Sequence, residues 1–343
     1  MISLALASAT MAPANGAAHE ALSARIAAER AAFQQFVARN SPAKAALEAL
    51  QLDKRLGDDA DTLGAPTPDG YTSDDWEETL ANLVAADSEL VDQIVGSVSP
   101  FSLQPGLHER LIRSAQDSEI DAVAIYEPAP PLRAVAIALH GNPQTESEFL
   151  AQPYLRRLAD ETHTAIIAPY GRGAYDFRGP ATADLYGLLL LVKKMPELAS
   201  LPFYLVGYSM GGFTAYMIGP SAPIVWSGVL DVSGALVGSA VPAVLKHWPS
   251  VRIYEVHGQM DTSIPTRFSH DTVVYLFSSG FAVSYYEEPG AGHFLRLLVP
   301  SLTNAWLDMH QGIVRDGEAA GLAREAERHL PGGFTPPAPM GRP

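Results

Sequence analysis

Hydrophobic and polar residues follow two different patterns along this chain, and the pattern changes near residue 117. Before that point, apolar residues recur at helical spacing, which places them on one face of an α-helix. After it, short continuous apolar runs alternate with helical patterns, as buried parallel strands and their connecting helices do. The pattern predicts an N-terminal helical segment over residues 1–116 and an α/β domain over residues 117–311.

The N-terminal segment is expected to be entirely helical. Its predicted helices cover residues 19–39, 42–56, 73–95 and 105–115, and a loop rich in acidic residues, Pro and Gly is predicted at 58–70. The segment shows no recognisable catalytic pattern. It is interpreted either as a packing appendage or as a lid, a cap or an oligomerisation element, and the sequence does not separate these roles.

The second part of the chain alternates strictly between strands and helices. Strands are predicted at 120–126, 133–139, 165–168, 203–206, 228–232, 252–256 and 282–286, and helices at 147–160, 183–195, 265–279 and 293–310. This alternation predicts an α/β fold with a mainly parallel central sheet and helices on both faces. Residues 312–343 are predicted to form a short charged helix and then a Pro- and Gly-rich tail that is poorly ordered at its end.

One strand-to-helix turn carries the strongest chemical signal. The sequence Gly-Tyr-Ser-Met-Gly, centred on Ser209, follows the apolar run 203–206. A turn this tight forces the serine into a strained backbone conformation, and the small residues two positions away let the strand and the helix approach each other. The turn exposes the Ser209 hydroxyl and directs the Met210 N–H and the positive end of the helix dipole toward the same point. Ser209 is therefore predicted to be a nucleophile.

Two later turns supply the groups that a serine nucleophile requires. A His-Gly-x-x-Asp turn ending at Asp261 follows the sixth predicted strand, and a Gly-Ala-Gly-His turn ending at His293 follows the seventh. Functional groups collect at the carboxyl ends of parallel strands, so these residues are expected to meet Ser209 there. His293 fits a general base and Asp261 an orienting acid. Asp231, near the end of the fifth predicted strand, is the alternative acid.

These turns resemble those of the α/β-hydrolase superfamily, in the chain order Ser209, Asp261, His293. The resemblance covers residues 117–311. It implies the α/β-hydrolase fold and an acyl-enzyme on Ser209, with His293 as general base and acid and Asp261 holding the histidine tautomer. The esterase and oligopeptidase-like enzymes of the superfamily are the branch it indicates.

The resemblance also implies an oxyanion hole. A His-Gly-Asn-Pro turn beginning at His140 follows the second predicted strand, where the superfamily has its second oxyanion donor. Carried over, the donors are the backbone N–H groups of Met210 and Asn142. The same turn resembles that of haloalkane dehalogenases and epoxide hydrolases, which use an Asp nucleophile. The serine at position 209 argues instead for acyl transfer of the ester type.

The loop over residues 170–179 is rich in Gly and aromatic residues and lies at the same edge of the predicted sheet. It resembles a loop of esterases and oligopeptidase-like hydrolases. Tyr175, Phe177 and Arg178 are predicted to line the pocket for the acyl or leaving group, and Tyr208 is predicted to contact substrate beside the nucleophile. The alternative for the aromatic residues of the loop is that they pack it onto the sheet.

Composition narrows the choice of function. The chain has 343 residues, no Cys, 38 acidic and 23 basic residues, and a formal charge of −15. Thiolate catalysis, disulfides and Cys-ligated metals are therefore excluded. No spacing of His, Asp or Glu indicates a metal site, and no cofactor is predicted. The negative charge argues against nucleic acid and anionic membrane surfaces as partners.

No apolar run reaches the roughly 18 residues that a membrane span requires. The first residues lack the basic region of a signal peptide. A cytoplasmic location is therefore expected, and export stays open.

Taken together, these patterns predict a serine hydrolase that cleaves small carboxylic esters. The first alternative is a serine peptidase; an aminopeptidase would need acidic residues near the site to bind the substrate amine. The second is a non-catalytic binding protein of the same fold, which the competent residues at every triad position disfavour. The insertion at 233–249 is too short for a large cap. The N-terminal helices are therefore hypothesised to cover the site or to form a homo-oligomer contact.

Overall fold

Eight strands form the central sheet, in the order β1-β2-β4-β3-β5-β6-β7-β8. The computed structural model describes residues 16–40, 51–96, 101–173, 177–222, 224–236, 248 and 251–329. The strands are β1 (Gly106–Arg113), β2 (Ile120–Glu127), β3 (Ala134–Leu139), β4 (Thr164–Pro169), β5 (Phe203–Tyr208), β6 (Trp226–Val232), β7 (Arg252–Gly258) and β8 (Ala282–Glu288). Strand β2 runs antiparallel to β1 and β4, and the strands from β4 to β8 pair in parallel. The expected mainly parallel sheet is confirmed.

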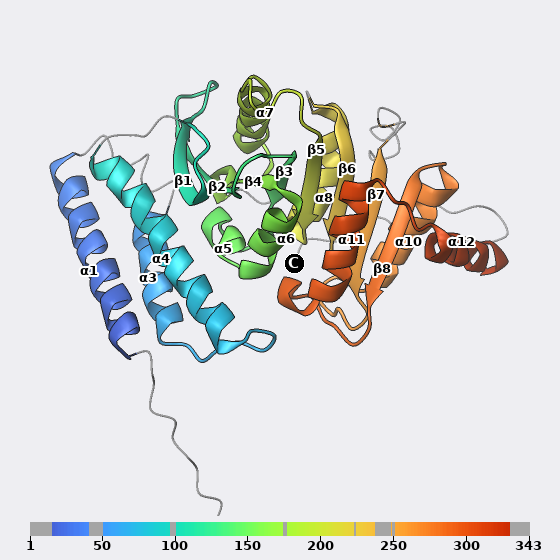
Figure 1. Ribbon diagram of the computed structural model, residues 1–343, viewed down its shortest axis with the longest axis horizontal. Helices are drawn as coiled ribbons and strands as arrows, with labels where there is room; N and C mark the ends of the chain where they lie inside the picture. The colour runs from blue at the N-terminus through green and yellow to red at the C-terminus, as the bar shows by residue number, and fades with distance from the viewer. Residues whose placement is uncertain are drawn as a thin grey trace, which may run out of the picture.

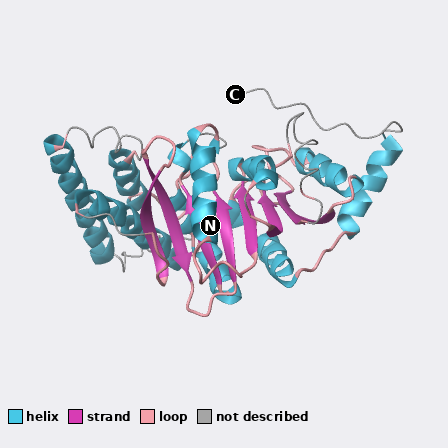
Figure 2. Cartoon of the chain, turned by 90° about the horizontal axis from the view of Figure 1, so that it is seen from above, coloured by secondary structure: helices cyan, strands magenta, loops and turns pink. Residues whose placement is uncertain are grey.

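Helices cover both faces of this sheet (Figure 2). One face packs against α5 (Glu146–Leu150), α6 (Pro153–Thr162) and α11 (Val299–Gln311). The other packs against α7 (Pro180–Lys193), α8 (Met210–Ile218), α10 (Arg267–Ser278) and α12 (Gly317–His329). The α/β architecture expected from the sequence is therefore confirmed.

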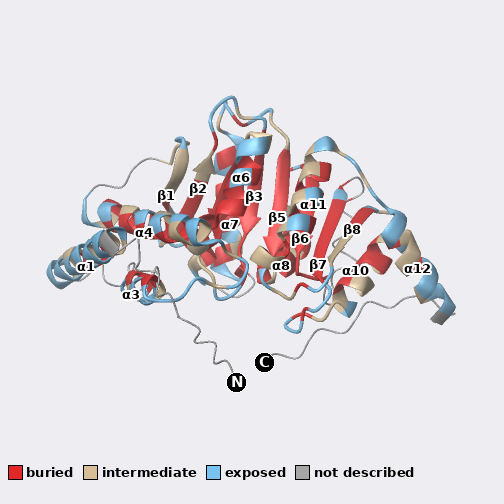
Figure 3. Ribbon diagram, turned by 60° about the horizontal axis from the view of Figure 1, so that its bottom comes forward, coloured by how far each residue is buried: buried red, intermediate tan, exposed pale blue. Residues whose placement is uncertain are grey.

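The central strands are buried along their whole length (Figure 3). In β3, Ile137 and Leu139 belong to one hydrophobic layer, whereas Ala136 and Ala138 belong to the other. Side chains of a strand alternate between the two faces of its sheet, so an uninterrupted apolar run is the pattern of a strand covered on both sides.

Three helices form a separate layer beyond the β1–β2 edge of the sheet (Figure 1). They are α1 (Gly16–Arg39), α3 (Leu52–Leu63) and α4 (Ser73–Val95), and their buried residues pack against Leu111 of β1 and Ala122 of β2. Helix α4 begins at a Thr72 cap, whose hydroxyl accepts a hydrogen bond from the Asp75 N–H. The apolar faces of these helices are thus buried at the edge of the sheet.

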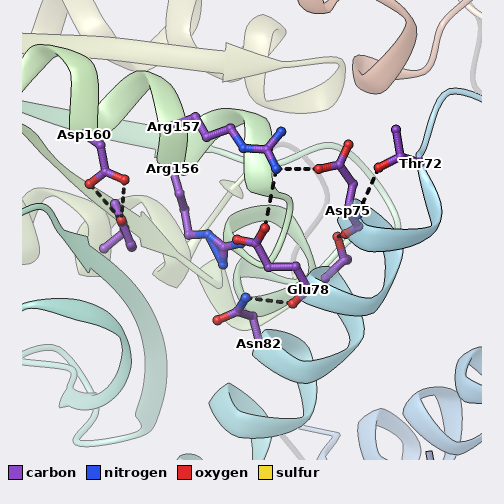
Figure 4. A network of polar contacts seen from close by, with 9 residues as sticks. Thr72, Asp75, Glu78, Asn82, Arg156, Arg157 and Asp160 are labelled. Atoms are coloured by element: carbon purple, nitrogen blue, oxygen red, sulfur yellow. Dashed lines mark hydrogen bonds and ion pairs between the residues drawn. The ribbon is translucent and has the colours of Figure 1, made fainter. Parts of the chain in front are cut away.

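Polar contacts join α4 to α6 at the surface (Figure 4). Glu78 accepts a hydrogen bond of 2.5 Å from Arg156, and Asp75 accepts one from Arg157. Arg156 is almost fully buried, and burial lowers its pKa. The contacts hold α4 against α6.

Two sequence predictions in the N-terminal segment are wrong. The helix predicted at 105–115 is instead strand β1 (Gly106–Arg113), so the sheet begins inside the range assigned to helices. Two charged residues in the middle of β1, Glu109 and Arg110, obscure its pattern because both are buried. Helix α4 covers this part of the strand: Arg110 pairs with Glu89, and the Glu109 backbone carbonyl accepts a hydrogen bond from Gln93.

The second error concerns the acidic stretch that was expected to be a loop. Helix α3 continues through Gly57 to Leu63, and the loop begins only after it. An ion pair of 2.7 Å between Lys54 and Asp58, one turn apart, supports the acidic part of this helix. The first part of the predicted helix 42–56 lies outside the described residues.

The remaining elements differ from expectation mainly at their ends. The helix predicted at 147–160 is two helices, α5 and α6, with Pro153 beginning the second. The helix predicted at 293–310 is a short 3₁₀ turn followed by α11. The charged helix expected after residue 312 is α12, and residues 330–343 lie outside the described part. Among the helices of the described ranges, none is long and apolar enough to cross a membrane.

Candidate active site

The turn between β5 and α8 has the conformation that the sequence predicts. Ser209 has φ 54° and ψ −115°, a region that side chains rarely adopt. Its N–H donates to the Val232 carbonyl over 2.8 Å. A Cβ atom at Gly211 would lie 2.0 Å from the Leu139 carbonyl oxygen, and one at Gly207 would lie 2.4 Å from the Gly211 carbonyl oxygen. Both positions therefore exclude any residue with a side chain.

The three residues predicted to form a triad lie in one hydrogen-bonded chain, with His293 between Ser209 and Asp261. The Ser209 Oγ lies 2.9 Å from His293 Nε2, and His293 Nδ1 lies 2.7 Å from Asp261 Oδ2. Ser209 follows β5, Asp261 follows β7 and His293 follows β8, so all three stand at the carboxyl edge of the sheet.

Asp261 is held in one orientation by its surroundings. Its Oδ1 accepts hydrogen bonds from the backbone N–H groups of Ser263 and Ile264, over 2.8 and 2.9 Å. Burial opposes the charge of this carboxylate. Hydrogen bonds from His257, His293 and the Ile264 N–H outweigh burial, and the pKa of Asp261 lies well below its ordinary value. A charged, fixed carboxylate therefore faces His293 Nδ1.

His257 precedes a glycine in the turn that carries Asp261, and its contacts hold that turn in place. Its Nε2 lies 2.8 Å from the Ile264 carbonyl oxygen and 3.4 Å from Asp261 Oδ2. The ring is fully buried, so it supports the turn that carries Asp261 and is closed to substrate.

The turn after β3 lies directly against the nucleophile. A Cβ atom at Gly141 would lie 2.9 Å from the Tyr208 ring and 3.2 Å from the Ser209 Cβ. Asn142 is the next residue, and the Met210 N–H is the first of helix α8, where the helix itself offers no acceptor. His140 fixes this turn through the carbonyl groups of Gly141, over 2.9 Å, and Tyr170, over 3.2 Å.

Asp231, the alternative acid, lies behind the nucleophile turn. A Cβ atom at Gly212 would lie 1.8 Å from Asp231 Oδ1. Asp231 lies opposite Glu255 in the register of the neighbouring strands β6 and β7. Burial raises the pKa of Asp231 to about 7, against the opposing effects of Glu255 and His257. Burial also raises the pKa of Glu255 well above its ordinary value. Among the hydrogen bonds of the described residues, the carboxylate that contacts His293 Nδ1 is that of Asp261 and not that of Asp231.

The Asp231→Asn variant is expected to become more stable than the wild type as the pH rises. A raised pKa means that the folded protein holds a proton which the unfolded chain releases above about pH 4, so this stabilisation is lost as the pH rises through about 7. The amide needs no proton. The melting temperature of the variant should exceed that of the wild type by at least about 4 °C at pH 8. The difference should shrink toward pH 4; a difference that does not change with pH would contradict the prediction.

The residues predicted to contact substrate have different surroundings. Tyr208 lies beside the triad: its ring centroid is 5.6 Å from that of His293, and its hydroxyl donates to the His293 carbonyl. Phe177 is fully buried against His140, which favours packing of the loop over contact with substrate. Arg178 is exposed, and Tyr175 lies outside the described residues.

A cavity of about 260 Å³ opens beside the nucleophile turn. Asn142 and Met210 line one side of it, and Lys54, Arg55 and Asp59 of helix α3 line another. The N-terminal helices therefore form part of the wall of the cavity. The sequence could not place them there, because nothing local to α3 indicates what it covers.

Arg55 connects this wall to the α/β part of the chain. Its guanidinium donates two hydrogen bonds to Glu146, of 2.8 and 3.1 Å, and lies 4.3 Å above the Tyr170 ring. Arg55 and Glu146 are buried, and Asp87 of α4 lies 3.5 Å from the guanidinium. Glu146 begins the helix that follows the Asn142 turn, so the ion pair also fixes that turn.

The Arg55→Met variant is expected to lose about 3–5 kcal/mol of unfolding free energy, because it leaves Glu146 charged, buried and unpaired. Denaturant unfolding measures the loss. Lys54→Met is the matched control: its ion pair with Asp58 is exposed, and its removal should change stability by less than about 1 kcal/mol. Adding Glu146→Gln to Arg55→Met should recover part of the loss. Equal effects of the Arg55 and Lys54 variants would contradict this account.

No protein-family model and no curated protein sequence matches the chain. Solved structures match its fold. The fluorophosphonate-binding serine hydrolase F of Staphylococcus aureus is 13% identical, with a TM-score of 0.51 over 60% of this chain and 99% of that one. The poly(3-hydroxybutyrate) depolymerase LpqC of Bordetella parapertussis is 16% identical, with a TM-score of 0.50 over 64% and 94% of the two chains. The chain therefore has the α/β-hydrolase fold that its motifs imply.

Proposed function

We propose that the protein is a serine hydrolase that cleaves carboxylic esters through an acyl-enzyme on Ser209. The observation that carries the proposal is the continuous hydrogen-bonded chain from the Ser209 hydroxyl through His293 to Asp261. The two similar structures are named as a serine hydrolase and a depolymerase, but at 13% and 16% identity they support the fold, and the reaction rests on the site.

Each group has a defined role in this reaction. His293 Nε2 accepts the Ser209 proton as the hydroxyl attacks the ester carbonyl, and it returns a proton to the leaving alcohol. Asp261 keeps the other ring nitrogen protonated and stabilises the imidazolium. The N–H groups of Met210 and Asn142 stabilise the oxyanion, each by about 3 kcal/mol. Water then hydrolyses the acyl-enzyme by the same steps.

Labelling with a fluorophosphonate probe tests the nucleophile directly. The expected adduct lies on Ser209, located by mass spectrometry of the digested protein, and is absent from the Ser209→Ala variant. Labelling of a different residue, or none in a folded protein, would overturn the proposal in favour of a binding protein.

The choice between ester and peptide hydrolysis needs a second assay. Turnover of p-nitrophenyl esters without turnover of aminoacyl anilides supports the esterase. Comparable turnover of both substrates would favour a serine peptidase instead.

We also propose that helix α3 acts as a fixed cover for one side of the substrate cavity. The proposal rests on Arg55 and Asp59, which line the cavity together with Asn142. A change of substrate profile in Arg55→Met, measured under conditions where the variant is fully folded, is the expected result.

A further inference from the structure

The cavity beside the oxyanion donors is acidic. Four carboxylates line it, from Asp58 and Asp59 on α3, Asp87 on α4 and Glu148 on α5, with two cations, Lys54 and Arg55. Both cations already have carboxylate partners. Lys54 pairs with Asp58 over 2.7 Å, and Arg55 forms its two hydrogen bonds with Glu146, behind the cavity wall. Arg55 also lies 3.5 Å from Asp87, so Asp59 and Glu148 are the acids of the lining without an ion-pair partner among the described residues.

Three oxygen atoms of the cavity lining are buried without a hydrogen-bond partner among the described residues: Asp59 Oδ2, Asp87 Oδ1 and Gln144 Oε1. Asp59 is 3% exposed, and its Oδ2 is buried without a partner. The Gln144 Oε1 is buried and also unpartnered. Glu148 accepts a hydrogen bond of 2.7 Å from the Thr145 N–H through Oε2, which leaves its other oxygen open. Buried acceptors without donors are costly, and a bound cation would satisfy them.

The chemistry of these oxygens selects the kind of cation. Among the described residues, no group of three or more His, Asp or Glu side chains is arranged to hold a metal ion. A primary ammonium has three N–H donors and one positive charge, which suits carboxylate and amide oxygens that have no other donor.

The position of the cavity indicates which part of a substrate would carry this group. His293 delivers a proton to the leaving alcohol, so the leaving group lies on the His293 side of Ser209. The described lining of the cavity includes the oxyanion donor residues but not His293. The cavity therefore lies on the acyl side.

Building on the proposed ester hydrolysis, we propose that this cavity binds an ammonium group on the acyl part of the substrate through Asp59 and Glu148. The substrate class is then esters of amino acids or of other amino-bearing carboxylic acids. The acidic residues that an amine-binding site requires come from α3 and α5, which the sequence alone did not connect.

The protonation of Asp59 provides a measurable sign of such binding. Burial, followed by the neighbouring charges of Asp87 and Glu148, raises the pKa of Asp59 to about 9, so its carboxyl group holds a proton at neutral pH. A bound ammonium favours the charged carboxylate and displaces that proton. Binding of an amine at pH 7 should therefore release a proton to the buffer.

Matched esters test the proposal by kinetics. Alanine p-nitrophenyl ester and its isostere, the isobutyrate ester, differ by an ammonium in place of a methyl group; the 6-aminohexanoate and heptanoate esters form a longer pair. In at least one pair, the wild type should have a higher kcat/KM for the ammonium ester. Asp59→Asn and Glu148→Gln should each lower that preference, the ratio of the two kcat/KM values, at least about tenfold.

The Asp61→Asn variant is the control, because Asp61 is an exposed acid of the same helix that does not line the cavity. It makes the same acid-to-amide substitution outside the cavity and should leave the preference unchanged. A preference for the neutral ester in both pairs, or one that neither cavity variant alters, would overturn the proposal. Hydrolysis of the neutral esters would then still support the proposed function.

A binding measurement keeps the test independent of catalysis. In Ser209→Ala, calorimetric titration at pH 7 should detect alaninamide more strongly than isobutyramide, with a heat that depends on the ionisation enthalpy of the buffer. Adding Asp59→Asn should abolish both effects. If no ester is hydrolysed but alaninamide binds in this way, the proposed function fails and the ammonium site stands; equal binding of the two amides would overturn the site.

Discussion

Replacing Ser209 with alanine is expected to lower kcat/KM for short-chain p-nitrophenyl esters by a factor of about 10⁶. In the proposed mechanism the Ser209 oxygen forms the acyl-enzyme, and its hydroxyl, 2.9 Å from His293 Nε2, supplies the proton that His293 accepts. The residual rate should exceed the rate in water by about 10³–10⁴, because the oxyanion donors and the binding cavity remain. Steady-state kinetics on protein with unchanged circular dichroism measures the effect.

Ser227→Ala is the matched control for this variant. Ser227 lies near the amino end of β6, at the opposite edge of the parallel sheet from the candidate site. Its activity should remain within twofold of the wild type. A Ser209→Ala protein that keeps more than a few per cent of the wild-type activity would mean that Ser209 is not the nucleophile.

The nucleophile turn could be predicted from the sequence because local geometry dictates its residues. Gly207 and Gly211 are required by backbone atoms within 2.4 Å of where a side chain would begin. The strands that precede Asp261 and His293 could also be predicted from the local sequence, because each is an apolar run that ends in a turn. Parallel strands share a carboxyl edge, so their chain order was sufficient to predict that the three residues meet.

The cavity wall could not be predicted in this way, because it depends on contacts between distant segments. Arg55 and Glu146 are 91 residues apart, and the sequence around either residue does not indicate that they form an ion pair. Asp59 belongs to an acidic stretch whose composition favours a loop. Packing of α3 against its neighbours overrides this local preference. Strand β1 could not be predicted for the same reason, because Glu89, the partner of its buried Arg110, lies on α4.

The sequence also left open which of two carboxylates serves His293. Asp231 and Asp261 both stand near the carboxyl ends of strands, and the pattern alone only favoured the second. The distances separate them: Asp261 lies 2.7 Å from His293 Nδ1, whereas Asp231 pairs with Glu255 inside the sheet. A comparison of the same substitution at both positions therefore tests the proposed roles.

The Asp261→Asn variant is expected to lower kcat by a factor of about 10⁴. The Asp261 Oδ1 accepts two backbone N–H groups, so the amide oxygen of the new side chain should take that position. The amide NH₂ then faces His293 Nδ1 and donates to it, which moves the ring proton to Nε2. A ring protonated there cannot accept the Ser209 proton, so kcat falls while KM changes little.

Asp231→Asn is the matched control, because it introduces the same amide into the neighbouring strand and leaves the His293 contact intact. Its kcat should remain within twofold of the wild type. The opposite result, with activity lost at Asp231 and kept at Asp261, would mean that His293 takes its carboxylate from β6 during catalysis. Loss at both positions, in folded proteins, would instead mean that the buried Asp231–Glu255 pair supports the nucleophile turn from behind, through the close approach of Asp231 to Gly212.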